Sequence, residues 1–345
     1  MEYTFRLAVA ADRAAVIGFI RQHWGAPHPL VELPDFFDYY YKAEESALRF
    51  ALAEADGRIV AAAGYVPASR GPAADVWVSL WVADPAARGS GLELMDALPA
   101  LTGCRTLACN NIRPETRPFY EFLGHTTGRV GHFYRLANRP EYRLAAVENK
   151  TMPPVGGQAV LTPLPTAEAL LACEFVPPRG ANPYKDIWYI RRRYFDFPRQ
   201  QYRLYAAALP GDTAPRALLA TRLTAATTDA WLSRRVYYAD TPSVVLRMVD
   251  YIGPAGFLPQ LGAGMDALLQ STAAEYAEFY CAGLPAQLLR QAGFAERTEG
   301  SPDILPTYLT PLARENTDFY YFTSRPDAFT LFRADGDQDR PHIPL

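Results

Sequence analysis

The sequence predicts an α/β fold in which two mixed, mostly antiparallel sheets are each flanked by helices. Three observations support this prediction. Residues 76–81 form a β-prone run that leads into a turn with two closely spaced glycines and then into an apolar helix. Asp56-Gly57 separates two apolar, β-prone runs and is therefore a strong hairpin signal. The order of hairpin, strand, glycine-containing helix start, strand and helix recurs between residues 202 and 294, which predicts an internal duplication.

The N-terminal half contains every element of one such unit. Residues 3–8 are strand-like, and Asp12 is placed to cap a helix over residues 14–20. An aromatic-rich segment at residues 23–41 precedes the hairpin. After the glycine turn we expect a helix, a strand, a second helix and a last strand that ends near residue 137. In the C-terminal half we expect strands at residues 202–208, 217–223, 244–252 and 276–281, and helices at 262–269 and before Gly293.

Length and charge limit the number of domains and the kinds of partner. At 345 residues the chain exceeds the usual size of one domain. We expect an N-terminal domain at residues 1–140, a linker or crossover strand rich in proline and glycine at 141–163, and a second domain at 164–345. The net charge of −3 gives no general attraction to nucleic acid or to an anionic membrane, so we expect neither as a partner.

The first residues and the cysteines indicate the cellular compartment. Residues 1–6 lack the basic start and apolar core of a signal peptide, and no uncharged apolar run approaches the length of a membrane span. We therefore expect a cytoplasmic protein without membrane insertion. The four cysteines show neither C-x-x-C spacing nor a neighbouring histidine pattern, so we expect free thiols and no metal site.

The glycine turn at residues 88–91, Arg88-Gly89-Ser90-Gly91, has the features of an anion-binding site, and we call it the cradle. A helix that begins there presents backbone N–H groups and the positive end of its dipole. Glycines at positions 89 and 91 would allow a diphosphate to approach the main chain, and Arg88 would add a charged fork. An ordinary tight turn before a helix is the alternative.

The cradle and a second segment resemble the GCN5-related N-acetyltransferase (GNAT) family, whose members use acyl-CoA. Arg88 and Gly91 match its R-x-x-G-x-G/A signature, but Glu93 replaces the last small residue. Residues 118–125, Pro-Phe-Tyr-Glu-Phe-Leu-Gly-His, resemble its F-Y-x-x-L-G-F segment. The resemblance implies tandem GNAT-like folds, with acetyl-CoA or another acyl-CoA bound at the first.

The same resemblance implies roles for residues near the cofactor. Tyr120 is expected to donate a proton to the departing thiolate of coenzyme A, which suits a phenol because it is protonated at neutral pH. The strand that carries Leu80 and Val82 is expected to splay from its neighbour and turn a backbone N–H toward the thioester carbonyl. Tyr120 as an ordinary amphipathic core residue is the alternative.

The acceptor amine must lose a proton, so a base is needed near the thioester. His28 is our first candidate base and His23 the second, both in the aromatic-rich segment that forms the acceptor side of this family's fold. Trp24 between them could form an apolar or sugar-stacking wall. His132 is a third candidate and would contact the substrate. A structural or surface role is the alternative for each histidine.

Two charged segments allow more than one interpretation. Near the C-terminus, we expect Asp335, Asp337, Asp339 and Arg340 to bind a hydroxyl-rich acceptor or to seal a domain interface, and a plain surface tail is the alternative. Their spacing is similar to a calcium loop, but the later Glu is absent. The run at residues 191–193, three arginines beside aromatic residues, predicts a solvated amphipathic helix rather than a nucleic-acid site.

The second copy has lost the residues that the chemistry requires. If Gly293 corresponds to Gly124, Leu289 stands where Tyr120 does, and Leu261 stands where Arg88 does. We therefore expect a scaffold or acceptor-binding domain. The chain as a whole resembles two-lobed acyltransferase-like proteins encoded among bacterial surface-polysaccharide genes, through Trp24 and His28, residues 64–67, 76–81 and 89–91, and the ending at 334–341. This resemblance implies an amino sugar acceptor, such as an O-antigen precursor.

The sequence thus predicts an N-acyltransferase that moves an acyl group from coenzyme A to a sugar amine. Two alternatives remain. One is a peptide-bridge ligase of related tandem fold that uses aminoacyl-tRNA, which would need a basic groove that a pI near 6.0 does not favour. The other is a non-catalytic binding module with a decayed cofactor site, which Glu93 favours because a carboxylate there repels a diphosphate.

Overall fold

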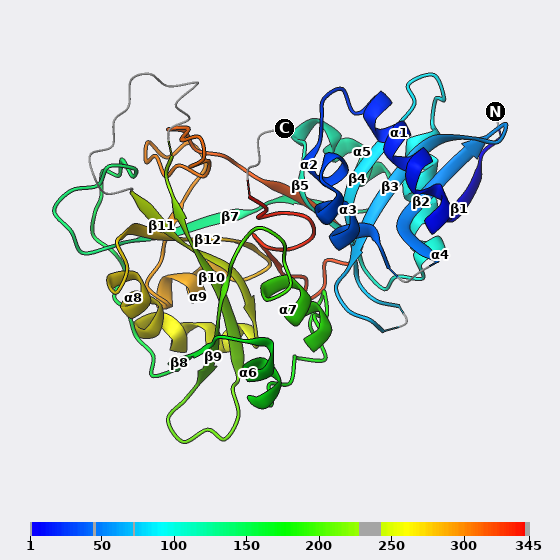
Figure 1. Cartoon of the computed structure of the whole chain (residues 1–345). Coiled ribbons are helices and arrows are strands. Elements are labelled where there is room, and N and C mark those ends of the chain that lie inside the picture. Colours follow the sequence, from blue (N-terminus) through cyan, green and yellow to red (C-terminus); the bar gives the residue numbers. More distant parts are fainter. Residues whose placement is uncertain (1, 44–45, 72, 228–242, 342–345) are drawn as a thin grey trace.

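The structure is a computed structural model that describes residues 2–43, 46–71, 73–227 and 243–341. Two sheets with helices against them make up the fold (Figure 1). The first half contains, in order, β1 (Thr4–Val9), α1 (Arg13–His23), α2 (Pro29–Glu32), α3 (Pro34–Tyr41), β2 (Ala47–Ala55), β3 (Arg58–Pro67), β4 (Val76–Ala83), α4 (Ser90–Thr102), β5 (Leu107–Ile112), α5 (Arg117–Phe122), β6 (Thr126–Arg129) and β7 (Gly131–Leu136).

The second half contains a similar set. Its elements are β8 (Val160–Leu164), α6 (Ala167–Ala172), α7 (Ile187–Tyr194), β9 (Arg203–Ala208), β10 (Ala217–Ala225), β11 (Val244–Ile252), α8 (Gly262–Gln270), β12 (Ala274–Ala282), α9 (Ala286–Gln291), β13 (Ala295–Arg297), β14 (Tyr320–Thr323) and β15 (Leu331–Phe332). Short 3₁₀ helices lie at Ala10–Asp12, Pro114–Thr116 and Ala255–Leu261.

Both sheets are mixed and mostly antiparallel, which confirms the predicted fold class. The first sheet has the order β1-β2-β3-β4-β5-β14-β6, and the second has the order β13-β7-β12-β11-β10-β9-β8, with β15 beside β12. Among the named strands of the described residues, the parallel ladders are those of β4 with β5 and of β11 with β12. The Asp56-Gly57 turn joins β2 and β3 as expected, with Asp56 at φ 51° and Gly57 at φ 72°.

The two sheets exchange strands. Strand β7 lies within the first 140 residues but pairs with β12 and β13 in the second sheet (Figure 1). Strand β14 comes from the C-terminal part and pairs with β5 and β6 in the first sheet. Strand β8 begins inside the segment expected to be a linker and forms the other edge of the second sheet. The chain therefore crosses between the sheets more than once.

The two faces of the first sheet are covered by different helices. One core packs α1, α2 and α3 against a face that includes Trp77 and Leu80 of β4. The other packs α4 and α5 against the opposite face, where Val78 and Cys109 lie. The period of two along a strand places alternate residues on these two faces. We call them the α1–α3 face and the α4–α5 face.

The repeated order of elements is visible in three dimensions as similar helix ends. At the end of α5, Gly124 has φ 80° and the His125 N–H donates to the Tyr120 carbonyl. At the end of α9, Gly293 has φ 91° and the Phe294 N–H donates to the Leu289 carbonyl. A left-handed glycine after the last turn satisfies the free carbonyls in the same way in both places. This supports the alignment of Gly293 with Gly124.

Two local expectations differ from the structure. Asp12 does not cap α1 with its side chain but accepts the Val9 N–H and an Arg6 guanidinium, which fixes the turn before the helix. Arg193, expected on a solvated helix face, is only 2% exposed and donates to the Ala334 and Gln338 carbonyls. Within the described part of the chain, no helix combines the length and the hydropathy that a membrane crossing needs.

Candidate active site

Strands β4 and β5 separate in the middle of the first sheet. They pair only at Val76 with Leu107 and at Trp77 with Ala108. Just beyond, the register of β4 against β3 shifts, so that Gly64 faces two residues, Ser79 and Leu80. Such a bulge bends the strand and interrupts its ladder. Because the β4–β5 ladder ends at Trp77, the two strands are unpaired at Leu80 and Val82, where the splay was expected. Both side chains are buried toward the α1–α3 face.

The cradle lies where β4 leads into α4. Gly89 caps the helix at φ 86°, a left-handed conformation that glycine adopts without strain. Gly91 is buried, and a Cβ there would lie 3.0 Å from the Ala83 Cβ. Its carbonyl accepts the Trp81 indole N–H at 3.1 Å. Gly91 therefore allows α4 to pack on β4, which is a different reason from the ligand approach that the sequence suggested.

The exposed groups at the cradle carry opposite charges. The Arg88 side chain is exposed, while its carbonyl accepts the Tyr3 hydroxyl at 2.9 Å. Ser90 is buried. The Glu93 Oε1 lies 3.3 Å from the point where a Cβ on Gly89 would be. Its carboxylate thus lies over the N-terminus of α4, where the helix dipole attracts an anion.

Tyr120 lies on the same α4–α5 face of the sheet as the cradle. It is buried on α5, stacked on Phe322 of β14 with ring centroids 4.1 Å apart, and 5.8 Å from the Trp81 ring. Burial raises the pKa of the phenol, so it stays protonated and can donate. Trp81 contacts both Tyr120 and Gly91, which connects the acid candidate to the cradle.

On the α1–α3 face, residues 333–340 lie against the separated strands, and we call them the C-terminal segment. The Asp337 carboxylate accepts the Ser79 hydroxyl of β4 at 3.1 Å, and Ser79 is 2.6 Å from the Tyr41 hydroxyl. The Asn110 amide of β5 donates to the Asp335 carbonyl at 3.3 Å. The segment thus bridges β4 and β5 after their ladder ends.

The three carboxylates of this segment are buried between the two sheets, so the surface-tail alternative is wrong. Asp339 accepts two bonds from Arg222 of β10, both at 2.8 Å, and one from Arg333. Burial disfavours its charged form, but the two guanidiniums outweigh burial and hold the pKa of Asp339 well below its usual range. The segment seals the contact between the sheets.

Asp335 has a different environment from Asp339. It shares the Lys185 ammonium with Asp250, and each carboxylate is 2.7 Å from the nitrogen. Burial and the neighbouring Asp250 carboxylate raise the pKa of Asp335 to about 6, against the opposing effect of Lys185. Lys185 and Asp250 both come from segments far from Asp335 in the sequence, so no local pattern indicated them.

His28 caps α2 and lies beside the C-terminal segment. Its Nδ1 accepts the Leu30 N–H at 3.3 Å, its Nε2 is 3.5 Å from an Arg340 nitrogen, and Trp24 contacts it edge-on at 5.1 Å. Burial and then Arg340 lower the pKa of His28 to about 4, against the effect of Asp337. His28 is therefore neutral at pH 7, as a base must be before it accepts a proton.

The other two histidine candidates lie elsewhere. His23 is at the end of α1, with its ring 4.6 Å from Phe19. His132 is fully buried on β7 in the second sheet and stacks on Tyr280 at 4.0 Å. Its Nδ1 accepts the Arg297 Nε–H at 3.0 Å, and its Nε2 is 3.6 Å from Glu278. The chain's own groups therefore surround both nitrogens of His132.

Apart from Asp339, the sequence did not indicate the polar residues where β5, β12 and the C-terminal segment meet. A cavity of about 30 Å³ there is lined by amide, charged and aromatic side chains, which are Asn110, Asn111, Tyr280, Phe319, Arg333, Gln338 and Asp339, together with Val130. Asn111 has φ 67°, and a positive φ is more frequent for Asn than for most residues. The pair Asn110-Asn111 at a strand end was the available signal.

The second copy has no open counterpart of the cradle. At the start of α8, the Ala263 N–H donates to the Gly156 carbonyl at 2.9 Å. A Cβ on Gly262 would lie 2.8 Å from that carbonyl oxygen, and one on Gly264 would lie 2.9 Å from Leu161. The segment before β8 therefore fills the space at this helix start, which explains why one half alone presents an exposed cradle.

The fold of this chain is similar to that of solved structures, although no match is found at the level of sequence. No protein-family model and no curated protein matches the chain. A GCN5-related N-acetyltransferase from Anabaena variabilis superposes with a TM-score of 0.53 at 8% identity, over 93% of this chain and 72% of that one. An Enterococcus faecalis protein, named as a probable N-acyltransferase, gives 0.52 at 9% identity, over 94% and 72%. The chain therefore has the fold of the GCN5-related N-acetyltransferases over nearly all of its length.

Proposed function

We propose that this protein is an acyl-CoA-dependent N-acyltransferase whose active site lies in the first sheet. The observation that carries the proposal is the splay of β4 from β5, with the cradle and Tyr120 on one face and the polar C-terminal segment on the other. Two reactants can approach such a gap from opposite faces. We further propose that residues 1–140 and 164–345, joined by 141–163, form two domains that exchange the strands β7 and β14, and that the protein acts in the cytoplasm.

The donor would bind on the α4–α5 face. Arg88, Gly89 and Ser90 would hold the diphosphate, with Gly91 setting the helix against the strand. A thioester supplies an activated acyl group, whose carbonyl would face the backbone at Leu80 and Val82. The acyl carbon forms a bond with the acceptor nitrogen, the bond to sulfur breaks, and Tyr120 gives its proton to the thiolate.

The acceptor would approach from the α1–α3 face, and we propose an amino sugar, such as a polysaccharide precursor. Amides, charged groups and aromatic rings line the small cavity beside β5, which has room for about one water molecule, so the acceptor ring would lie outside it and reach these polar groups from its edge. His28, which is neutral at pH 7, would accept the proton from the acceptor amine, with His23 as the second candidate base and Trp24 as a wall. The shape of the acceptor side would also depend on five residues that lie beneath it, which are His132, Asp335, Asp337, Asp339 and Arg340.

The test of the donor site is titration with acetyl-CoA. Because a charged hydrogen bond to phosphate contributes about 1.5 kcal/mol or more, Arg88→Gln is expected to weaken binding roughly tenfold. The measurement is isothermal titration calorimetry of the whole chain. The matched control is Arg290→Gln on α9, which is equally exposed and should bind as the parent does. No binding by the parent protein would contradict the proposal.

Glu93 is the observation that favours a second candidate, a binding module with a decayed cofactor site. Because its carboxylate lies over the helix N-terminus, Glu93→Gln is expected to tighten acetyl-CoA binding about three- to fivefold. The same titration measures it, with Asp96→Asn on the next turn of α4 as the control. If the parent protein does not bind acetyl-CoA and the Glu93→Gln variant does, the result would favour the binding module with a decayed cofactor site.

The environment of His28 predicts a pH dependence of stability. Its pKa is near 4 in the folded chain and about 6.5 when unfolded, so the unfolded chain binds more protons between these values. The lowered pKa of His28 is expected to contribute a loss of roughly 2 to 3 kcal/mol of stability as the pH drops from 6.5 to 4. The raised pKa of Asp335 contributes a gain over the same range. Urea unfolding at several pH values measures this. His28→Gln should remove the His28 contribution, so this variant should lose less stability on acidification than the parent does, whereas His23→Gln should leave the pH dependence as in the parent.

A further inference from the structure

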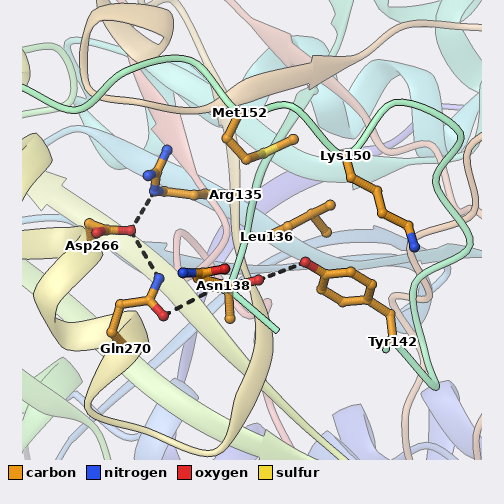
Figure 2. A pocket seen from close by; sticks show the side chains of 9 residues that line it. Arg135, Leu136, Asn138, Tyr142, Lys150, Met152, Asp266 and Gln270 are labelled. Atoms are coloured by element: carbon orange, nitrogen blue, oxygen red, sulfur yellow. Dashed lines mark hydrogen bonds and ion pairs between the residues drawn. The ribbon is translucent and has the colours of Figure 1, made fainter. Parts of the chain in front are cut away.

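A polar cavity of about 440 Å³ lies on the second sheet, away from the proposed active site. It opens between the end of β7, the loop that follows it and the second half of α8 (Figure 2). This volume is in the range of small-molecule sites. Its lining residues are Arg135, Leu136, Ala137, Asn138, Tyr142, Lys150, Met152, Asp266 and Gln270, and none of them belongs to the proposed transfer site.

One wall of the cavity is held rigid by a chain of hydrogen bonds. Arg135 donates to Asp266 Oδ1 at 2.6 Å, and Gln270 donates to the same oxygen at 3.2 Å (Figure 2). The Gln270 Oε1 in turn accepts the Asn138 N–H at 3.2 Å. Tyr142 donates to the Ala137 carbonyl at 2.6 Å. These bonds fix the side chains before any ligand arrives, which lowers the entropy cost of binding.

The groups left over on this wall indicate what a ligand must offer. Both bonds to Asp266 use Oδ1, so Oδ2 remains as an acceptor. The Asn138 side-chain amide, with no hydrogen bond among the described residues, offers both a donor and an acceptor. A group that only accepts cannot satisfy these atoms. A hydroxyl both donates and accepts, so the ligand should carry several hydroxyls.

The charge of the cavity indicates an anionic ligand. Arg135 is neutralised by Asp266. The exposed Lys150 ammonium lies 5.4 Å over the Tyr142 ring and forms no ion pair with the residues that the structure describes. A second cavity of about 490 Å³ shares Asn138 and Gln270 with the first and adds two arginines, Arg139 and Arg143, against one Glu141. The neighbourhood is therefore positive.

We propose that this cavity binds an acidic sugar, with a carboxylate at Lys150 and ring hydroxyls at Asn138 and Asp266. Because none of its residues takes part in the proposed acyl transfer, the site does not depend on that function. In the second copy, the Gly156 carbonyl already accepts an N–H at the start of α8, so no cradle is open there. The cavity would therefore give the second sheet a binding role of its own.

The test is isothermal titration of the full chain with galacturonate, galactose and inorganic phosphate at low ionic strength. We expect galacturonate to bind at millimolar concentration or tighter and more strongly than the other two. Lys150→Gln should weaken galacturonate at least fivefold and leave galactose unchanged, and Asn138→Ala should weaken both sugars. The control is Lys42→Gln, an exposed lysine of the first half.

Three outcomes would overturn the proposal. Galacturonate could fail to bind at all. It could bind with equal strength after both cavity substitutions, which would place it elsewhere. Phosphate could bind as tightly as galacturonate, which would show that the cavity attracts anions through its positive charge and does not recognise hydroxyl groups. Lys150 and Asn138 are both exposed, so the variants are expected to fold, and thermal unfolding of each one checks this.

Discussion

Replacing Tyr120 by phenylalanine is expected to lower kcat for acyl transfer ~100-fold, because a positioned general acid contributes about that much or more. The phenol lies on the cradle face, and burial keeps it protonated, so it can supply the proton that the leaving thiolate needs. Only the hydroxyl is removed, and the ring still stacks on Phe322. Binding of acetyl-CoA, measured by titration, should change less than twofold.

A matched control separates catalysis from packing. Tyr65 on β3 packs against the same core as Tyr120, and burial also raises its pKa. Tyr65→Phe removes a phenol from that core without touching α5, so its kcat should stay close to that of the parent. Full turnover by Tyr120→Phe would contradict its role as the acid. An equal loss in both variants would indicate a packing effect.

The Asp339→Asn substitution is expected to lower the free energy of unfolding by about 3 to 5 kcal/mol, since removing one partner from a buried ion pair leaves an uncompensated charge. Asp339 is bonded by both Arg222 and Arg333, whose side chains are only 11% and 12% exposed. Glu278 would be the remaining carboxylate near Arg333. Denaturant unfolding of the whole chain measures the change.

An exposed pair of the same chemistry is the control. Asp212 accepts two bonds from Arg216, at 2.7 and 2.8 Å, in the turn between β9 and β10. Because Arg216 is half exposed, solvent screens this pair, and Asp212→Asn should cost much less than Asp339→Asn. Similar losses in the two variants would show that the C-terminal segment does not hold the sheets together.

The local elements of the first sheet could be predicted because they depend on neighbouring residues. Asp56-Gly57 determines its hairpin, since the turn requires positive φ at both positions. Gly89 marks the start of α4 and Gly124 the end of α5, because both need a positive φ. The resemblance at residues 118–125 also placed Tyr120 on the face of the cradle. Asp12 does not cap α1 as expected, and the packing of Gly91 against β4 is a tertiary contact that no local pattern indicated.

Strand exchange and buried charge could not be predicted from such patterns. A short, aromatic-rich strand such as β7 or β14 carries no local signal for one sheet over the other, so its partner depends on which edge the rest of the fold leaves open. Arg193 was expected on a solvated helix face, and no sequence pattern indicates which residues would neutralise Asp339. Both side chains become buried only because partners more than a hundred residues away neutralise or bond them.

The sequence by itself therefore determined the two α/β units, the positions of the cradle and Tyr120, and the loss of both from the second unit. The tertiary structure alone decided that the C-terminal segment bridges β4 and β5, that Glu93 lies over the cradle, and that Gly156 fills the second helix start. The physical reason is the separation along the chain of the residues that interact. Backbone conformation and side-chain periodicity are set by adjacent residues, whereas these contacts join segments that only the folded chain brings together.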